Sequence, residues 1–192
     1  MTGKSFARST VFTALFAALT AAAGFISFPL PGGVPIVLQN MMTVLNGLLL
    51  GPWAGTAATA LFVAVGVAGL PVFSGGTGGI VKLTGPTGGF IAGYIIASLV
   101  AGLIAGRPKA GKKTPVFLIA LASVAAFVSI YVPGVFHFIR LKGCTFAEAM
   151  AYTVTPFIIG DAIKAVLCVL LSIPLRKTAA IYIYGDSDDD KG

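Results

Sequence analysis

The stretch that decides the class of fold is GGFIAGYIIASLVAGLIAG, residues 88–106, which contains no charged residue. A helix of about 20 apolar residues crosses a bilayer core, so this stretch is long enough to span a membrane. The rest of the chain has the same character, because 57% of its 192 residues are hydrophobic, 10% are charged and the mean hydropathy is +0.97. Ordinary water-soluble domains do not reach such values, and the sequence therefore predicts an integral membrane protein.

Five further apolar runs of similar length lie on either side of this stretch. They cover residues 9–28, 34–51, 53–70, 114–138 and 155–175. Turn residues separate successive runs, as in the PLPGG sequence of residues 29–33 and at Gly51-Pro52, and Pro133-Gly134 is expected to break the run at 114–138. We therefore predict an all-α bundle of about six transmembrane helices that forms a single membrane domain over residues 1–192.

Two of the connecting segments have a character of their own. Residues 71–89 are rich in glycine and too polar for a lipid-facing helix, which predicts an outer loop or backbone that is buried in protein. Residues 145–152 favour a short interfacial helix, because Thr145 and Glu148 have the spacing of a capping box.

Basic residues are distributed unevenly between the two sides of the predicted bundle. Six spans place both termini on one side, and nine of the 13 Lys and Arg residues fall on that side. Three fall on the other side, namely Lys82, Arg140 and Lys142. Because short cytoplasmic loops are enriched in Lys and Arg, we expect both termini in the cytoplasm, with residues 176–192 as a tail. The same distribution explains the net charge of +7 without a nucleic-acid partner.

Motifs for catalysis or cofactor binding are incomplete in this chain. Residues 106–113 resemble a phosphate-binding loop, but Lys113 occupies the position of the Ser or Thr that would bind magnesium. Cys144 and Cys168 lack metal-ligand spacing, and His137 has no carboxylate or cysteine beside it in the sequence. We therefore expect no enzymatic activity, no metal and no cofactor.

One pair of ionisable residues lies inside a predicted span, in FIIGDAIKAVL of residues 157–167. A charged residue at a helix centre costs about 2.5 to 3.5 kcal/mol on insertion scales, so such residues face protein, a cavity or each other. Asp161 and Lys164 are three positions apart and share one helix face, close enough to pair or to hold one ligand together. A structural ion pair and a polar ligand site both remain open, and we favour the ligand site.

Small residues form two further patterns. Glycines of residues 71–89 would let the backbone approach a ligand, and the free N–H groups at the start of the 88–106 span suit an anionic group; a flexible loop is the alternative. The spacing of Gly85, Gly89 and Gly93 also favours close packing against a neighbouring helix. In the first span a row of alanines favours close helix contact, either within the chain or with a partner. That row consists of Ala14, Ala18 and Ala22.

Four segments, taken in order, resemble the BioY family. They are VPIVLQN at residues 34–40, GVAGLPVF at 66–73, GPTGGF at 85–90 and PFIIGDAIK at 156–164. Each motif is moderately specific, and their order is more so. Members of that family are six-helix substrate-binding subunits of energy-coupling-factor transporters. They bind biotin near the outer face and work with a transmembrane coupling subunit and two ATPase subunits.

The resemblance implies a role for each candidate residue. Asp161 and Lys164 match the family's Asp-x-x-Lys, which takes part in holding biotin; we assign the ureido N–H groups to the aspartate and the valerate carboxylate to the lysine. The other substrate-binding candidates are Thr87, Gly88, Phe90, Tyr94, Phe73 and Tyr131. The alanine row becomes the candidate interface with the coupling subunit.

The function expected from the resemblance is high-affinity binding of biotin and its uptake across the bacterial cytoplasmic membrane, as the substrate-capture subunit of a transporter driven by a partner's ATP hydrolysis. An ion- or proton-coupled carrier for another small polar metabolite, with Asp161 as proton acceptor, is the alternative.

Overall fold

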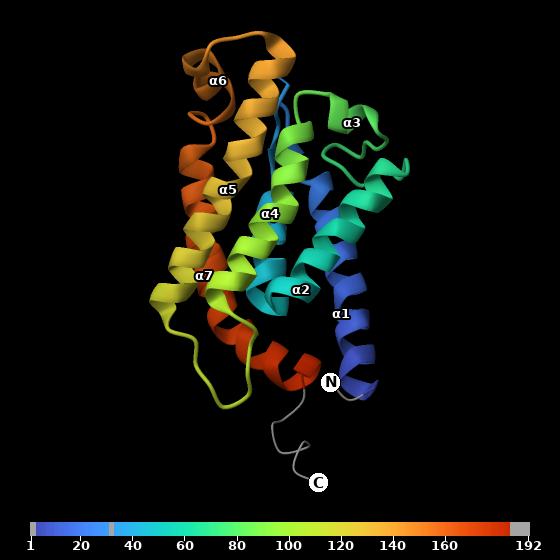
Figure 1. Ribbon diagram of the computed structural model, residues 1–192, viewed down its shortest axis with the longest axis vertical. Helices are drawn as coiled ribbons and strands as arrows, with labels where there is room; N and C mark the ends of the chain where they lie inside the picture. Colours follow the sequence, from blue (N-terminus) through green and yellow to red (C-terminus); the bar gives the residue numbers. More distant parts are fainter. Residues whose placement is uncertain (1–2, 31–32, 185–192) are drawn as a thin grey trace.

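The structure is a computed structural model that describes residues 3–30 and 33–184 (Figure 1). Within these residues, five helices are long and apolar enough to cross a membrane, namely α1, α2, α4, α5 and α7. The elements in chain order are α1 (Gly3–Ala22), the 3-10 helix η1 (Ala23–Phe25), β1 (Ser27–Phe28), β2 (Ile36–Val37), α2 (Gln39–Val67), α3 (Val81–Thr84), α4 (Gly88–Ala105), α5 (Val116–Lys142), α6 (Phe146–Thr153) and α7 (Ile158–Tyr184).

Helix α2 consists of two helical segments that reverse direction at Gly51. Gly51 has φ 73° and ψ −177°, a conformation that is essentially restricted to glycine. Pro52 follows, and its missing N–H suits the first turn of the second segment. The second segment folds back on the first, so that Asn46 Nδ2 donates to Thr59 Oγ1 at 3.1 Å (Figure 1). Counted separately, the two segments of α2 bring the five long helices to six within the described residues, and the prediction of an all-α bundle of about six helices is confirmed.

Helix α4 lies between α2 and α5 and approaches both closely through glycines. A Cβ atom at Gly47 of α2 would overlap the carbonyl oxygen of Ser98 on α4. Gly89 and Gly93 of α4 face the backbone of α5 at Pro133 and Ile130 in the same way. Since lipid provides no hydrophobic drive between helices, such close contacts hold the bundle together. Close packing was predicted correctly for these two glycines of α4, whereas Gly85 precedes the helix.

Several of the predicted span boundaries, and the predicted break in the fifth span, differ from the structure. The second span begins at Gln39 rather than at residue 34, because residues 36–37 form β2. Helix α1 runs from residue 3 to 22 rather than from 9 to 28, because residues 27–28 leave the helix to form β1, which pairs antiparallel with β2. Helix α5 continues through Pro133-Gly134 without a break. Proline removes one backbone hydrogen bond, and the close contact of α4 with this part of α5 supports the helix.

The predicted cytoplasmic tail also begins too early. Helix α7 continues to Tyr184, so residues 176–184 are helical rather than tail. Arg176 is buried at 5% exposure and donates to backbone carbonyls of α2 and α4, and Ala179 and Ile183 pack in a buried cluster with Leu50 of α2, so these turns belong to the bundle. Residues 185–192, the rest of the predicted tail, lie outside the described residues.

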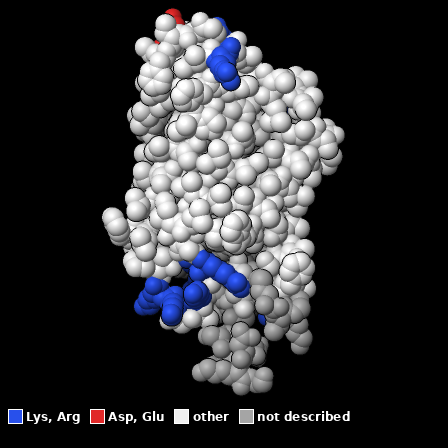
Figure 2. Space-filling model, in the orientation of Figure 1, with Lys and Arg blue, Asp and Glu red and all other residues white. Residues whose placement is uncertain are grey.

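Charged side chains gather at the two ends of the molecule. Figure 2 shows Lys and Arg clustered at the lower end, a few charged residues at the upper end and an uncharged middle on this face. Helix α1 begins and α7 ends at the lower end (Figure 1). The predicted short helix is confirmed as α6 at the upper end, where Thr145 and Glu148 form the capping box. An apolar middle between charged ends is the distribution that a bilayer requires, and the protein is a multi-pass membrane protein.

Candidate ligand-binding site

Asp161 and Lys164 meet in the upper half of the bundle, at the start of α7. The Lys164 Nζ and Asp161 Oδ1 atoms are 2.9 Å apart, and the two residues are only 7% and 8% exposed. The predicted sharing of one helix face is confirmed. A buried pair of opposite charges avoids the cost of a lone charge in the bundle.

The ammonium of Lys164 has all three of its donors engaged. It donates to the carbonyl oxygen of Val37 at 2.8 Å, to Asn40 Oδ1 at 3.1 Å and to Asp161 Oδ1 at 2.9 Å. An ammonium has three N–H groups and no acceptor. In this structure Lys164 therefore holds the segment before α2 against α7, and it has no donor left for a ligand.

The carboxylate of Asp161 is oriented by three donors. Its Oδ1 accepts from Lys164 and from Asn40 Nδ2 at 3.0 Å, and its Oδ2 accepts from the Tyr131 hydroxyl at 2.6 Å. A carboxylate offers about four acceptor positions. One position on Oδ2 is left, and Asp161 lines the cavity described below.

Asn40 belongs to the same cluster, although its role was not predicted. Its Oδ1 accepts from Lys164 and from the Met41 N–H, while its Nδ2 donates to Asp161. The reverse amide orientation would place oxygen against a carboxylate and NH₂ against an ammonium, so the charges fix the orientation. Within the described residues the second N–H of Nδ2 has no partner, and Asn40 lines the cavity. A polar residue at the start of a buried helix was the signal available in the sequence.

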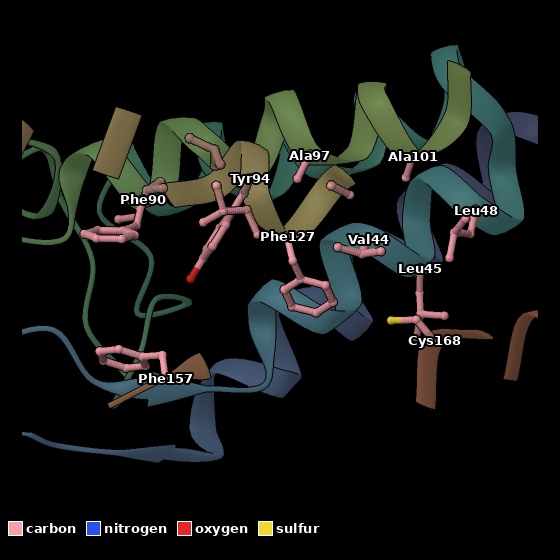
Figure 3. Close-up of a cluster of buried hydrophobic side chains, with 14 of the residues drawn as sticks. Val44, Leu45, Leu48, Phe90, Tyr94, Ala97, Ala101, Phe127, Phe157 and Cys168 are labelled. Carbon is pink, nitrogen blue, oxygen red and sulfur yellow. The ribbon is translucent and has the colours of Figure 1, made fainter. Parts of the chain in front are cut away.

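A cavity opens above this cluster, with an empty volume of about 580 Å³ including its mouth. Aromatic side chains line it. Figure 3 shows Phe90 and Tyr94 of α4 on one side and Phe157 across from them. Six of the eight predicted substrate-binding residues line the cavity, whereas Gly88 and Lys164 do not. The six are Asp161, Thr87, Phe90, Tyr94, Phe73 and Tyr131. The arrangement offers a polar base, with an acceptor and a donor side by side, below apolar walls.

Glycines leave room for two of the aromatic rings that line the cavity. A Cβ at Gly66 would overlap the ring of Phe73, and Phe62 packs edge-on against that ring at 5.5 Å between centroids. A Cβ at Gly134 would likewise overlap the ring of Phe90. These glycines leave the space that the rings occupy, so the shape of the cavity depends on positions outside its lining.

The glycine-rich segment forms one side of the mouth. Ser74 and Thr87 line both the cavity and a neighbouring groove, and Lys82 lies in that groove. His137 Nε2 lies 2.9 Å from the carbonyl oxygen of Gly85 and ties the segment to α5. The predicted glycine-rich loop is therefore ordered at the upper end of the bundle, with α3 inside it, and it borders the route into the cavity.

The alanine row of α1 faces away from the bundle. Ala14, Ala18 and Ala22 are exposed, whereas Ala17 is buried against the core. The row was expected to make close helix contact either within the chain or with a partner. Ala17, beside the row, packs within the chain, whereas the three alanines of the row lie on the surface.

Comparison with known proteins gives consistent matches over nearly the whole chain. The family model described as the BioY family matches residues 1–181. The biotin transporter BioY of Rhodobacter capsulatus is 36% identical over 86% of this chain and 91% of its own. That of Thermotoga maritima is 37% identical over 88% of this chain and 96% of its own. The solved S-component for biotin from an ECF-type ABC transporter superimposes with a TM-score of 0.82 at 27% identity, covering 96% of this chain and 98% of that one.

Proposed function

Because the chain belongs to the BioY family, we propose that it is the substrate-binding subunit of a biotin uptake system and has no enzymatic activity of its own. The observation that carries this proposal is the pairing of Asp161 with Asn40 at the base of an aromatic cavity.

The ureido ring of biotin matches that base. It presents N–H donors and a carbonyl acceptor on one rigid edge. The open position on Asp161 Oδ2 accepts an N–H, and the second N–H of Asn40 donates to the carbonyl. The apolar bicycle then lies among Phe73, Phe90 and Tyr94. Hydrogen bonds to a charged group contribute about 1.5 to 3 kcal/mol each. The polar end of the cavity therefore provides much of the selectivity for biotin over ligands that lack a ureido group.

The valerate carboxylate requires a different partner from the one first expected. Lys164 has no free donor and does not line the cavity, so we assign it the role of positioning Asp161 and Asn40. A second carboxylate beside Asp161 would be repelled, whereas Lys82 lies in the groove at the mouth. We assign the carboxylate to the mouth, near Thr87 and Lys82.

Transport requires partners that this chain does not contain. We propose that the end with the basic residues faces the cytoplasm, which places both termini there and the cavity mouth outside. The exposed row of Ala14, Ala18 and Ala22 would contact a transmembrane coupling subunit, and two ATPase subunits would supply the energy.

The test is a titration of the detergent-purified chain with biotin, with thiamine and riboflavin as control ligands. We expect tight binding of biotin alone, with a loss of at least about tenfold in Asp161→Asn, the equivalent of one hydrogen bond to a charged group. Gly160→Ala is the matched control on the same helix, since no atom lies within 4 Å of a Cβ there. Absence of biotin binding by folded protein would reject the proposal and favour an ion-coupled carrier.

The assignment of the carboxylate has its own test. Lys82→Gln should weaken binding of biotin while leaving the uncharged biotin methyl ester unaffected, because only the acid interacts with the ammonium. An equal loss for both ligands would contradict the assignment.

A further inference from the structure

A second cavity lies at the lower end of the bundle, between the loop of residues 106–115 and the last turns of α7. Its empty volume is about 1290 Å³, open mouth included. Four exposed lysines line it, three from the loop and one from α7: Lys109, Lys112, Lys113 and Lys177. This cavity is far along the bundle from the candidate ligand site and shares no lining residue with it.

The positive charge of this cavity is unbalanced within the described residues. The acidic residues among them are Asp161, which belongs to the upper cluster, and Glu148, which caps α6 at the opposite end. The loop itself is held by buried Arg176, which donates to the Gly106 carbonyl and to Thr114 Oγ1, each at 2.9 Å. The lysines therefore project from an anchored segment.

The remaining wall of the cavity is apolar. Val116 of α5 and Ile173 and Ile181 of α7 line it, and they are 53%, 47% and 45% exposed. The loop connects the ends of α4 and α5, so in a bilayer the lysines lie at headgroup level and the apolar residues lie on the membrane side. A basic rim above an apolar wall matches an amphiphile with an anionic head.

We propose that this cavity binds one anionic phospholipid, with its phosphate among the lysines and an acyl chain along the apolar wall. Basic pockets between transmembrane helices on the cytoplasmic side suit such headgroups. A free phosphate would leave the apolar wall exposed, and so would a polar segment such as the acidic residues 186–190. The proposal does not depend on the transported substrate.

The test compares phosphatidylglycerol with phosphatidylcholine of identical acyl chains, using the detergent-purified chain and counting bound lipid by native mass spectrometry. A lysine near an anionic surface contributes a factor of about five, so we expect phosphatidylglycerol to be retained at least about tenfold better. Lys112→Gln/Lys113→Gln should remove most of this preference. Arg140→Gln/Lys142→Gln, an equal loss of charge at the other end, should keep it.

Each remaining outcome also decides the question. No preference, a preference that survives in the lysine variant, or an equal loss in both variants would overturn the proposal. Inorganic phosphate that displaces the lipid completely at equal concentration would show a phosphate site rather than a lipid site. A chain ending at Tyr184 should bind the lipid at least as well; binding seen only after this truncation would identify the acidic tail as the occupant and overturn the proposal.

Discussion

Replacing Lys164 with methionine tests the charge cluster most directly. Lys164→Met keeps the apolar stem of the side chain and removes the ammonium, leaving the buried Asp161 with Asn40 and Tyr131 as donors. Breaking a buried ion pair from one side costs about 3 to 5 kcal/mol, because the other charge is left unpaired. For a chain of this length, 1 kcal/mol shifts the unfolding temperature by about 2 to 4 °C, so we expect a decrease of about 6 to 20 °C.

The double variant separates charge from packing. Asp161→Asn/Lys164→Met removes both charges, and replacing a buried pair by neutral groups is often without net cost. We therefore expect the double variant to unfold within a few degrees of the wild type. Its biotin affinity should nevertheless fall by at least about tenfold, as in Asp161→Asn, because the amide oxygen that replaces the carboxylate of Asp161 is a weaker hydrogen-bond acceptor.

The assay is thermal unfolding of the wild type, both single variants and the double variant in one detergent, with biotin titrations at about 20 to 25 °C, where all four are folded. An unchanged unfolding temperature for Lys164→Met would refute the reasoning that an unpaired charge remains. A double variant as unstable as the sum of the two single variants would refute it as well.

Two further predictions concern the walls and the upper end. Gly66→Ala should weaken biotin binding by about tenfold or more, because its Cβ would displace the Phe73 ring, whereas Gly160→Ala should leave the affinity in the titration unchanged. Hydrogen bonds from the Thr145 backbone N–H and hydroxyl lower the pKa of Glu148 from its ordinary value of 4.5. The stability that this carboxylate gives to α6 is therefore fully present above pH 4.5 and is lost as the pH falls through the lowered pKa. Amide exchange of α6 measured at about pH 7 and about pH 3 should show the loss; equal protection at both would contradict it.

The sequence was sufficient for the bundle because lipid imposes a simple requirement. Every crossing must be a helix of apolar residues, so runs such as 88–106 are visible without knowledge of their neighbours. The pairing of Asp161 with Lys164 was predictable for the same reason, since two charges on one face of a buried helix need each other. The apolar helices and the Asp161–Lys164 pair each follow from residues that are close together in the sequence.

Contacts between distant segments account for what was missed. Lys164 donates to the Val37 carbonyl, 127 positions away, and no side-chain pattern identifies a backbone acceptor. Arg176 resembled a cation of the tail for the same reason: its partners are carbonyls at helix ends, which only the assembled bundle brings together. The role of Asn40 was missed because its partners, Lys164 and Asp161, lie on α7, far away in the sequence.

The reversal at Gly51 has a consequence for how the chain enters the membrane during synthesis. The first segment of α2, residues 39–50, has 12 residues and is about 18 Å long, well short of a bilayer core of about 30 Å. Residues 43–51 are all buried in protein, and Thr43 and Asn46 are among them. A segment this short and polar gains little from lipid alone. We therefore expect this segment to enter the membrane together with residues 52–67 as a helical hairpin. Its close contact with α4 at Gly47 can form only after α4 has been synthesised, so we expect this part of the bundle to complete its packing late.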